Sequence, residues 1–128
     1  MLTFEFVRLG VPCTVQTQNR SRIENYKRDV RRAAVNRWPG NNLPLTIPVS
    51  VILTYFYTLD LMDVDNIIKP VLDQLKGLVY ADDKQVVSVT CRKIDVLSSE
   101  AVVAITSPVL ATAFRSRSDF LHVLVQWE

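Results

Sequence analysis

Apolar and polar residues recur along the chain with two different spacings, and these spacings predict its secondary structure. Thr3 to Leu9 alternates residue by residue and predicts a short strand. A helix is expected from about Asn19 or Ser21 to Trp38, because Ser21 and Glu24 have the spacing of a capping box. Its isoleucine, tyrosine, valine and alanine residues share one sector, beside a band of basic side chains. We therefore expect the helix to pack through its apolar stripe and to expose the basic band.

The middle of the chain predicts a buried strand followed by an amphipathic helix. Val49 to Leu59 is β-branched, aromatic and almost continuously apolar, which is typical of a central strand covered on both faces. After Asp63 the apolar residues fall on one side of a helical wheel, and Asp, Asn and Lys fall on the other. Because proline disrupts a helix interior, this helix is expected to begin late, with Asp65 or Asn66 as its cap, or to bend at Pro70.

The last third of the chain gives weaker signals. Val86 to Val96 and Ala101 to Thr106 read as two strands, which a turn between them would join into a β-hairpin. Beyond Pro108, Val109 to Phe114 fits a helical turn and Asp119 to Trp127 fits a short helix or a strand. The order β-α-β-α-β-β predicts an α+β fold, a mixed sheet packed against two main helices, with an irregular or short-helical C-terminal tail. We expect a single domain over residues 1–128, with a core of about 1–106 and a tail of about 107–128.

Charge is unevenly distributed, although the net charge of the 128 residues is only +2. Residues 1–38 carry a formal charge of +5, and residues 39–128 carry −3. A basic region next to an acidic one indicates a polyanion held near a cation-binding cluster. The alternative is a solvated helix face that happens to be rich in arginine.

The cysteine and histidine content limits the chemistry. Cys13 and Cys91 are far apart and form no CxxC pair, so we expect two free thiols in a reducing cytoplasm. A single histidine, His122, excludes a histidine-rich zinc site. We also expect no signal peptide and no membrane span, because no sufficiently long apolar stretch occurs.

Aspartates concentrate between Asp60 and Gln85, and they are the main chemical signal in the chain. They are Asp60, Asp63, Asp65, Asp73, Asp82 and Asp83. In the predicted order of elements they converge on one edge of the sheet, where a divalent cation would offset their repulsion. Mg²⁺ prefers such oxygen ligands, polarises phosphoryl groups and activates water. Lys69 lies one helical turn from Asp65 and Asp73, so it either stabilises charge on a phosphate or forms an intrahelical ion pair.

Three other interpretations of these aspartates are open to different degrees. A calcium-binding EF-hand starting at Asp63 fails, because Ile68 and Gln74 stand where glycine and glutamate are required. A phosphotransfer enzyme with a nucleophilic aspartate is disfavoured, because such a site typically occurs in a larger Rossmann-like chain. The third interpretation is that Asp63 only caps a helix and Asp82-Asp83 only forms a turn.

The segment from Asp63 to Val86, DVDNIIKPVLDQLKGLVYADDKQV, closely resembles the RusA family of Holliday-junction resolvases from bacteria and their phages. The strands and helix before it and the expected hairpin after it are compatible with that fold over roughly residues 1–106. Val15-Gln16 followed by an arginine-rich helix also resembles many members.

The resemblance implies a homodimeric, Mg²⁺-dependent endonuclease that cuts two strands of a four-way DNA junction symmetrically, in DNA recombination and repair. By position, Asp63, Asp65 and Asp83 are expected to hold one or two Mg²⁺ ions, and with Lys69 to form the catalytic set. Asn66, Asp73 and Asp82 also occupy motif positions and are expected to support that set. The residues expected to bind DNA phosphates are Arg20, Arg22, Lys27, Arg28, Arg31 and Arg32.

The sequence therefore predicts hydrolysis of phosphodiester bonds in four-way or other branched DNA. One alternative is a non-catalytic module that binds branched DNA with structural carboxylates and is indifferent to metal. Another is a Mg²⁺-dependent nuclease for flaps or other branches. Comparing cleavage of junction, flap and linear duplex separates these functions.

Overall fold

Four strands form one mixed sheet in a computed structural model that describes residues 1–13, 19–60 and 62–128. The strands are β1 (Leu2–Leu9), β2 (Val49–Tyr57), β3 (Val86–Asp95) and β4 (Phe120–Trp127). Their order across the sheet is β1-β4-β2-β3. β2 and β3 run parallel, and β4 runs antiparallel to both β1 and β2. The expected α+β class with a mixed sheet is confirmed.

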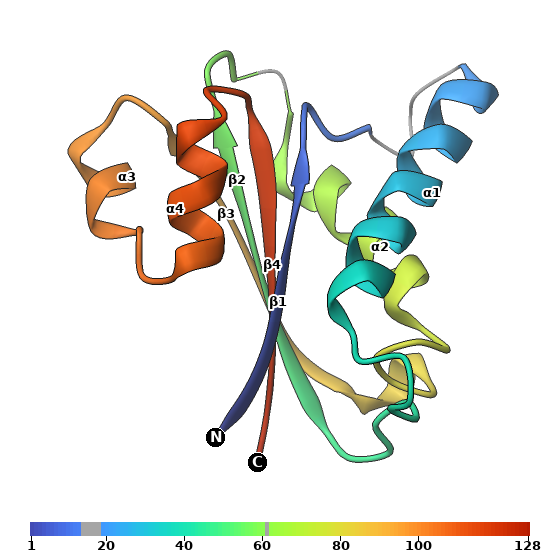
Figure 1. Ribbon diagram of the computed structural model, residues 1–128. Coiled ribbons are helices and arrows are strands. Elements are labelled where there is room, and N and C mark those ends of the chain that lie inside the picture. The colour runs from blue at the N-terminus through green and yellow to red at the C-terminus, as the bar shows by residue number, and fades with distance from the viewer. Residues whose placement is uncertain (14–18, 61) are drawn as a thin grey trace.

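Helices cover both faces of this sheet (Figure 1). The long helices α1 (Arg20–Arg37) and α2 (Val64–Leu75) pack on one face, and the short helices α3 (Ser99–Val103) and α4 (Pro108–Arg115) lie on the other. A 3-10 turn, η1 (Asp83–Gln85), precedes β3. Among the described residues, no helix has the length and hydropathy needed to cross a membrane.

β2 is buried on both faces, as its apolar sequence predicts. Val51, Leu53 and Tyr55 pack into the large core beneath α1 and α2. Phe56 points to the opposite face and stacks on Phe120 with ring centroids 4.6 Å apart. Burying each such side chain contributes about 1.5–3 kcal/mol, so β2 fixes both layers onto the sheet.

The predicted hairpin is wrong. β3 pairs in parallel with β2, and the expected strand from Ala101 to Thr106 is instead helix α3 with the residues that follow it. Ser98 caps this helix, since its hydroxyl accepts a hydrogen bond from the Ala101 N–H. A short apolar run fits a helix or a strand equally well by periodicity, and here the cap favours the helix.

Residues 107–128, expected to be an irregular or short-helical tail, form a helix and a strand: the helical turn at Val109 to Phe114 and the strand alternative for Asp119 to Trp127 are confirmed, and the irregular alternative is wrong. Ser107 caps α4 and Pro108 occupies its first turn, a common way to start a helix. β4 then lies between β1 and β2, and Phe120, Leu121 and Val123 are fully buried. The observed order is β-α-β-α-β-α-α-β, so the fourth strand comes from the segment expected to be a tail.

The two long helices begin at asparagine and aspartate caps. Asn19, one of the two expected starts, caps α1 by accepting a hydrogen bond from the Arg22 N–H. Asp63 is the N-cap of α2, so the later start at Asp65 or Asn66 is wrong and Pro70 lies inside the helix with its ring buried. The Val15-Gln16 feature lies outside the described residues.

Candidate active site

Asp63 and Asp65 project from the start of α2, where the chain turns back after β2. Asp63 has extended backbone dihedrals (φ −86°, ψ 144°), yet its carboxylate makes no capping hydrogen bond. Asp65 is in the first turn of the helix, and both side chains are exposed. Mg²⁺ is commonly bound by one or two carboxylates together with water and substrate phosphate. Asp63 and Asp65 therefore suit a magnesium ion, because they offer carboxylate oxygens and are open to solvent.

Lys69 lies on the exposed face of the same helix, one turn beyond Asp65. Its Nζ is 3.5 Å from Oδ1 of Asp73, which is the intrahelical ion pair considered above. The lysine side chain is 75% exposed, and exposed ion pairs of this kind are weak. Pairing with Asp73 therefore leaves the ammonium group able to exchange onto a phosphate.

Asp83 lies beside the C-terminal half of α2. Its Oδ2 is 3.7 Å from Nζ of Lys76, and it lines a shallow pocket of about 150 Å³ that also contains Lys69 and Asp73. The neighbouring Asp82 has a structural contact, because its carboxylate accepts a hydrogen bond from the Lys84 N–H in a capping box. One aspartate of this pair thus shapes the turn, and the other points to α2.

The expected convergence of all the aspartates on one edge of the sheet does not occur within one chain. Since β2 and β3 are parallel, α2 runs from their carboxyl ends back to the start of β3. Asp63 and Asp65 lie at the start of α2, whereas Asp83 lies farther along the helix, beside Asp73 and Lys76. Among the described residues, no three His, Cys, Asp or Glu side chains are grouped so that they could hold a metal ion. The metal-binding roles of Asp63, Asp65 and Asp83 stay predictions.

Lys93 is a functional candidate that the sequence reasoning missed. It lies on β3, and its Nζ donates hydrogen bonds to Oδ1 of Asp60 at 2.6 Å and to the Met62 carbonyl at 2.7 Å. The hydrogen bond with Asp60 raises the pKa of Lys93, and the charge of Asp63 raises it further. Only the parallel register of β2 and β3 brings Lys93 to this point, so no local sequence signal reveals it.

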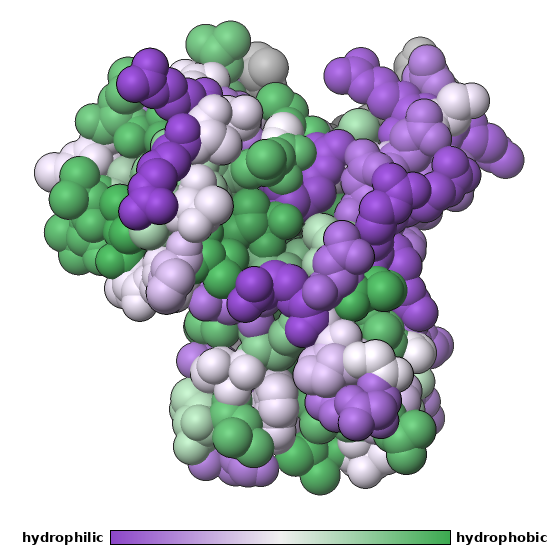
Figure 2. All heavy atoms as spheres, in the orientation of Figure 1, coloured by the Kyte–Doolittle hydropathy of each residue, from purple (hydrophilic) through white to green (hydrophobic). Residues whose placement is uncertain are grey.

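The predicted DNA-binding residues divide into two groups. Arg20, Arg22, Arg28 and Arg32 are exposed on α1, where Figure 2 shows a hydrophilic surface along the helix. Arg31 is different, because its Nη1 donates to the carbonyls of Gln74 (2.7 Å) and Lys76 (3.1 Å) at the end of α2. Lys27 is partly buried.

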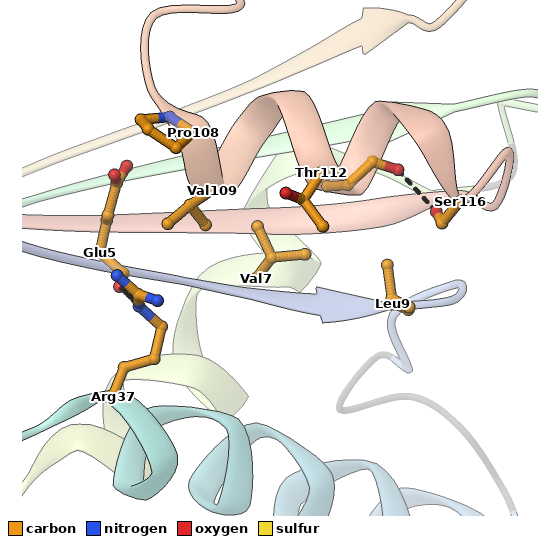
Figure 3. Close-up of a pocket in the computed structure, with 9 residues that line it drawn as sticks. Glu5, Val7, Leu9, Arg37, Pro108, Val109, Thr112 and Ser116 are labelled. Atoms are coloured by element: carbon orange, nitrogen blue, oxygen red, sulfur yellow. Dashed lines mark hydrogen bonds between the residues drawn. The ribbon is translucent and has the colours of Figure 1, made fainter.

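A separate cavity lies on another part of the fold. It has a volume of about 510 Å³ and lies between β1 and α4, where Val109 and Thr112 face Val7 (Figure 3). Arg37 closes one end by donating a hydrogen bond from Nε to the Glu5 carbonyl at 3.0 Å. None of the predicted site residues lines this cavity, so we assign the chemistry to the start of α2.

The remaining nucleophilic candidates are poorly suited to catalysis. Burial raises the pKa of the Cys91 thiol to about 11, so the thiol is protonated near neutral pH. His122 is buried on the opposite face of the sheet, with Nε2 2.7 Å from Oε2 of Glu5. A covalent mechanism through either side chain is therefore disfavoured by the fold.

Comparison with known proteins gives the family of this chain. The family described as Endodeoxyribonuclease RusA matches residues 6–106, which include α2, η1 and Lys93 and end before α4. A search of curated proteins finds no match. The family is one of metal-dependent nucleases acting on branched DNA. The match covers most of the sequence, and the chain therefore belongs to the RusA family of endodeoxyribonucleases, the Holliday-junction resolvases.

Proposed function

We propose that this chain resolves four-way DNA junctions by Mg²⁺-dependent hydrolysis at Asp63 and Asp65. The observation that carries the proposal is that Asp63 occupies the N-cap of α2 without capping it. Aspartate at this position ordinarily accepts a hydrogen bond from the helix backbone. A carboxylate that is exposed instead, two residues before a second exposed carboxylate, is suited to bind a cation.

Lys69 is proposed to stabilise the negative charge that develops on the scissile phosphate. Its exposed ammonium group needs only to exchange Asp73 for a phosphate oxygen. Mg²⁺, when bound, polarises the phosphoryl group and activates the attacking water. Asn66 follows Asp65 on the same helix and is proposed to orient the carboxylates, and Asp73 is proposed to hold Lys69 until DNA binds.

Asp83 is proposed to act as a metal ligand within a homodimer. Among the described residues, Asp83 is not grouped with Asp63 and Asp65 of its own chain, so a second copy packed about a two-fold axis is the simplest source of a third carboxylate. The same symmetry presents two active sites to opposing strands of a junction. Asp82 supports this role indirectly through the turn that carries Asp83.

The exposed arginines of α1 are proposed to bind DNA phosphates. Contacts of this kind fix the position of the duplex but carry little sequence information, and they make affinity strongly dependent on salt. Two free cysteines are consistent with a reducing cytoplasm as the place of action.

A synthetic four-way junction with titrated Mg²⁺ tests the proposed function. We expect paired, symmetric nicks that disappear in Asp65→Asn and persist in Glu24→Gln, a matched loss of charge on α1. Gel filtration with light scattering should give the mass of a dimer. Junction binding that is indifferent to every divalent metal, without cleavage, would instead indicate the non-catalytic binding module. Equal cleavage of flaps and junctions would favour the flap nuclease.

A further inference from the structure

Two side chains that come later in the sequence hold Thr58 and Met62, the residues near the two ends of the connection between β2 and α2 that presents Asp63. At its start, the Asp119 carboxylate accepts hydrogen bonds from the Thr58 N–H (3.1 Å) and from the Thr58 hydroxyl (2.7 Å). The other Asp119 oxygen accepts a hydrogen bond from the Tyr55 hydroxyl at 2.8 Å. The end of β2 is therefore fixed by three hydrogen bonds to one carboxylate.

Lys93 holds the other end of the same connection. Its Nζ donates a hydrogen bond to the Met62 carbonyl, which belongs to the peptide unit that joins Met62 to Asp63. The Met62 side chain is buried in the hydrophobic core, which also restrains that peptide unit. Asp60 supplies the carboxylate that keeps the lysine in place, with an Nζ to Oδ1 distance of 2.6 Å.

Asp63 has the extended backbone dihedrals of a capping residue (φ −86°, ψ 144°), yet its carboxylate makes no capping hydrogen bond. The peptide unit before it is held by Lys93, and α2 begins directly after it. Asp63 therefore stands at a fixed place in the backbone with its carboxylate exposed.

We propose that Lys93 and Asp119 are positioning residues that clamp the connection before α2 and so preorganise the Asp63 carboxylate for a divalent cation. The inference rests on the proposed role of Asp63 as a metal ligand. It adds Lys93 of β3 and Asp119, which directly precedes β4, to the site, and Asp119 lies beyond the residues that match the family. Residues that orient metal ligands commonly affect metal affinity by about 10–100-fold.

Lys93→Met is the main test, since methionine retains much of the packing of the lysine stem. The matched control is Arg92→Met, which removes a cation from the adjacent residue of β3, where Arg92 donates to Thr54 instead. Thr58→Val is a milder change at the other clamp, because it removes one hydroxyl and leaves the backbone hydrogen bond. Thermal melts of all three variants establish that each is folded.

Two measurements on protein without DNA provide the readouts. In the metal-free protein, Lys93→Met and Thr58→Val should speed hydrogen exchange at the backbone amides of Asp63 to Asn66, relative to wild type and Arg92→Met. Titration with Mn²⁺, followed by electron paramagnetic resonance, should show affinity about 10-fold weaker for Lys93→Met and unchanged for Arg92→Met.

The outcomes separate this inference from the proposed function. Wild-type exchange and wild-type Mn²⁺ affinity in Lys93→Met would overturn the clamp. If Mn²⁺ binding is the same in Asp63→Asn as in wild type, the proposed metal role of Asp63 fails. Faster hydrogen exchange in Lys93→Met would still show that Lys93 clamps the connection.

In cleavage assays, Lys93→Met should raise the Mg²⁺ concentration needed for half-maximal rate. A lower kcat at saturating Mg²⁺ with unchanged Mg²⁺ dependence would mean that Lys93 acts on the substrate and not by positioning.

Discussion

His122 is a buried histidine at the centre of the sheet, with only 6% of its surface exposed. Its partner Glu5 also accepts a hydrogen bond from the hydroxyl of Ser107, the residue that caps α4. Burial lowers the pKa of His122, and the hydrogen bond with Glu5 opposes that shift without cancelling it. The neutral imidazole is therefore the form that the fold favours.

This shift predicts that acid destabilises the protein through His122. The folded-state pKa lies below the ordinary value of 6.5, so the contribution of His122 to stability is present above that pH and is lost as the pH falls through the folded-state pKa. Urea unfolding at pH 7.5 and pH 5.5 should show a smaller loss of unfolding free energy in His122→Gln than in wild type. An equal loss in both proteins would assign the acid sensitivity to other groups.

At the scale of elements, α1 and α2 are joined by an arginine that the charge pattern assigned to DNA. The Arg31 guanidinium donates to two carbonyls at the C-terminal end of α2, where helix carbonyls lack intrahelical partners. A cation at this end also interacts favourably with the helix dipole. Arg28, three residues earlier, donates a hydrogen bond to Asn25 of its own helix and is exposed.

The two arginines should consequently respond differently to the same substitution. Arg31→Gln is expected to lower the unfolding free energy by about 1–2 kcal/mol, because charged hydrogen bonds to carbonyls are lost. Arg28→Gln should leave stability within about 0.5 kcal/mol of wild type. It should weaken junction binding and reduce the salt slope by about one. Denaturant unfolding measures the stability of both variants, and junction binding at several salt concentrations measures their DNA affinity. Unchanged stability together with weaker junction binding in Arg31→Gln would mean that Arg31 contacts the DNA and not α2.

At the scale of the whole molecule, residues 107–128 are needed to complete the sheet. β4 is hydrogen-bonded to β1 on one side and to β2 on the other, so β1 has no strand partner without it. Phe120, Leu121, Val123 and Val125 of β4 are fully buried. At about 1.5–3 kcal/mol each, their loss approaches the entire stability of a typical domain.

A chain ending at Thr106 should therefore fail to fold, even though it contains every predicted site residue. We expect it to lose near-UV circular dichroism and cooperative urea unfolding. In the full chain, Leu121→Ala should cost about 2–5 kcal/mol by opening a cavity in the core. Cooperative unfolding of the shortened chain at the wild-type midpoint would show that residues 107–128 are dispensable.

Much of the fold and part of the site are predictable because they depend on local patterns. The apolarity of β2, the amphipathic face of α2 and the spacing of Asp63, Asp65 and Lys69 are all properties of neighbouring residues. Local patterns were ambiguous for Ala101 to Val103, where a short apolar run fits either a strand or a helix. They also misjudged the cap of α2, since Pro70 is accommodated inside the helix.

The sequence by itself determined which elements carry the acidic and basic side chains, because helix and strand periodicity is set within a few residues. Only the tertiary structure decided where those side chains lie relative to one another. Parallel pairing of β2 with β3 separates Asp83 from Asp63 along α2 and brings Lys93 to Asp60. Insertion of β4 brings Asp119 to Thr58. These contacts join residues 33 and 61 positions apart, so they follow from strand order and register, which no local pattern encodes.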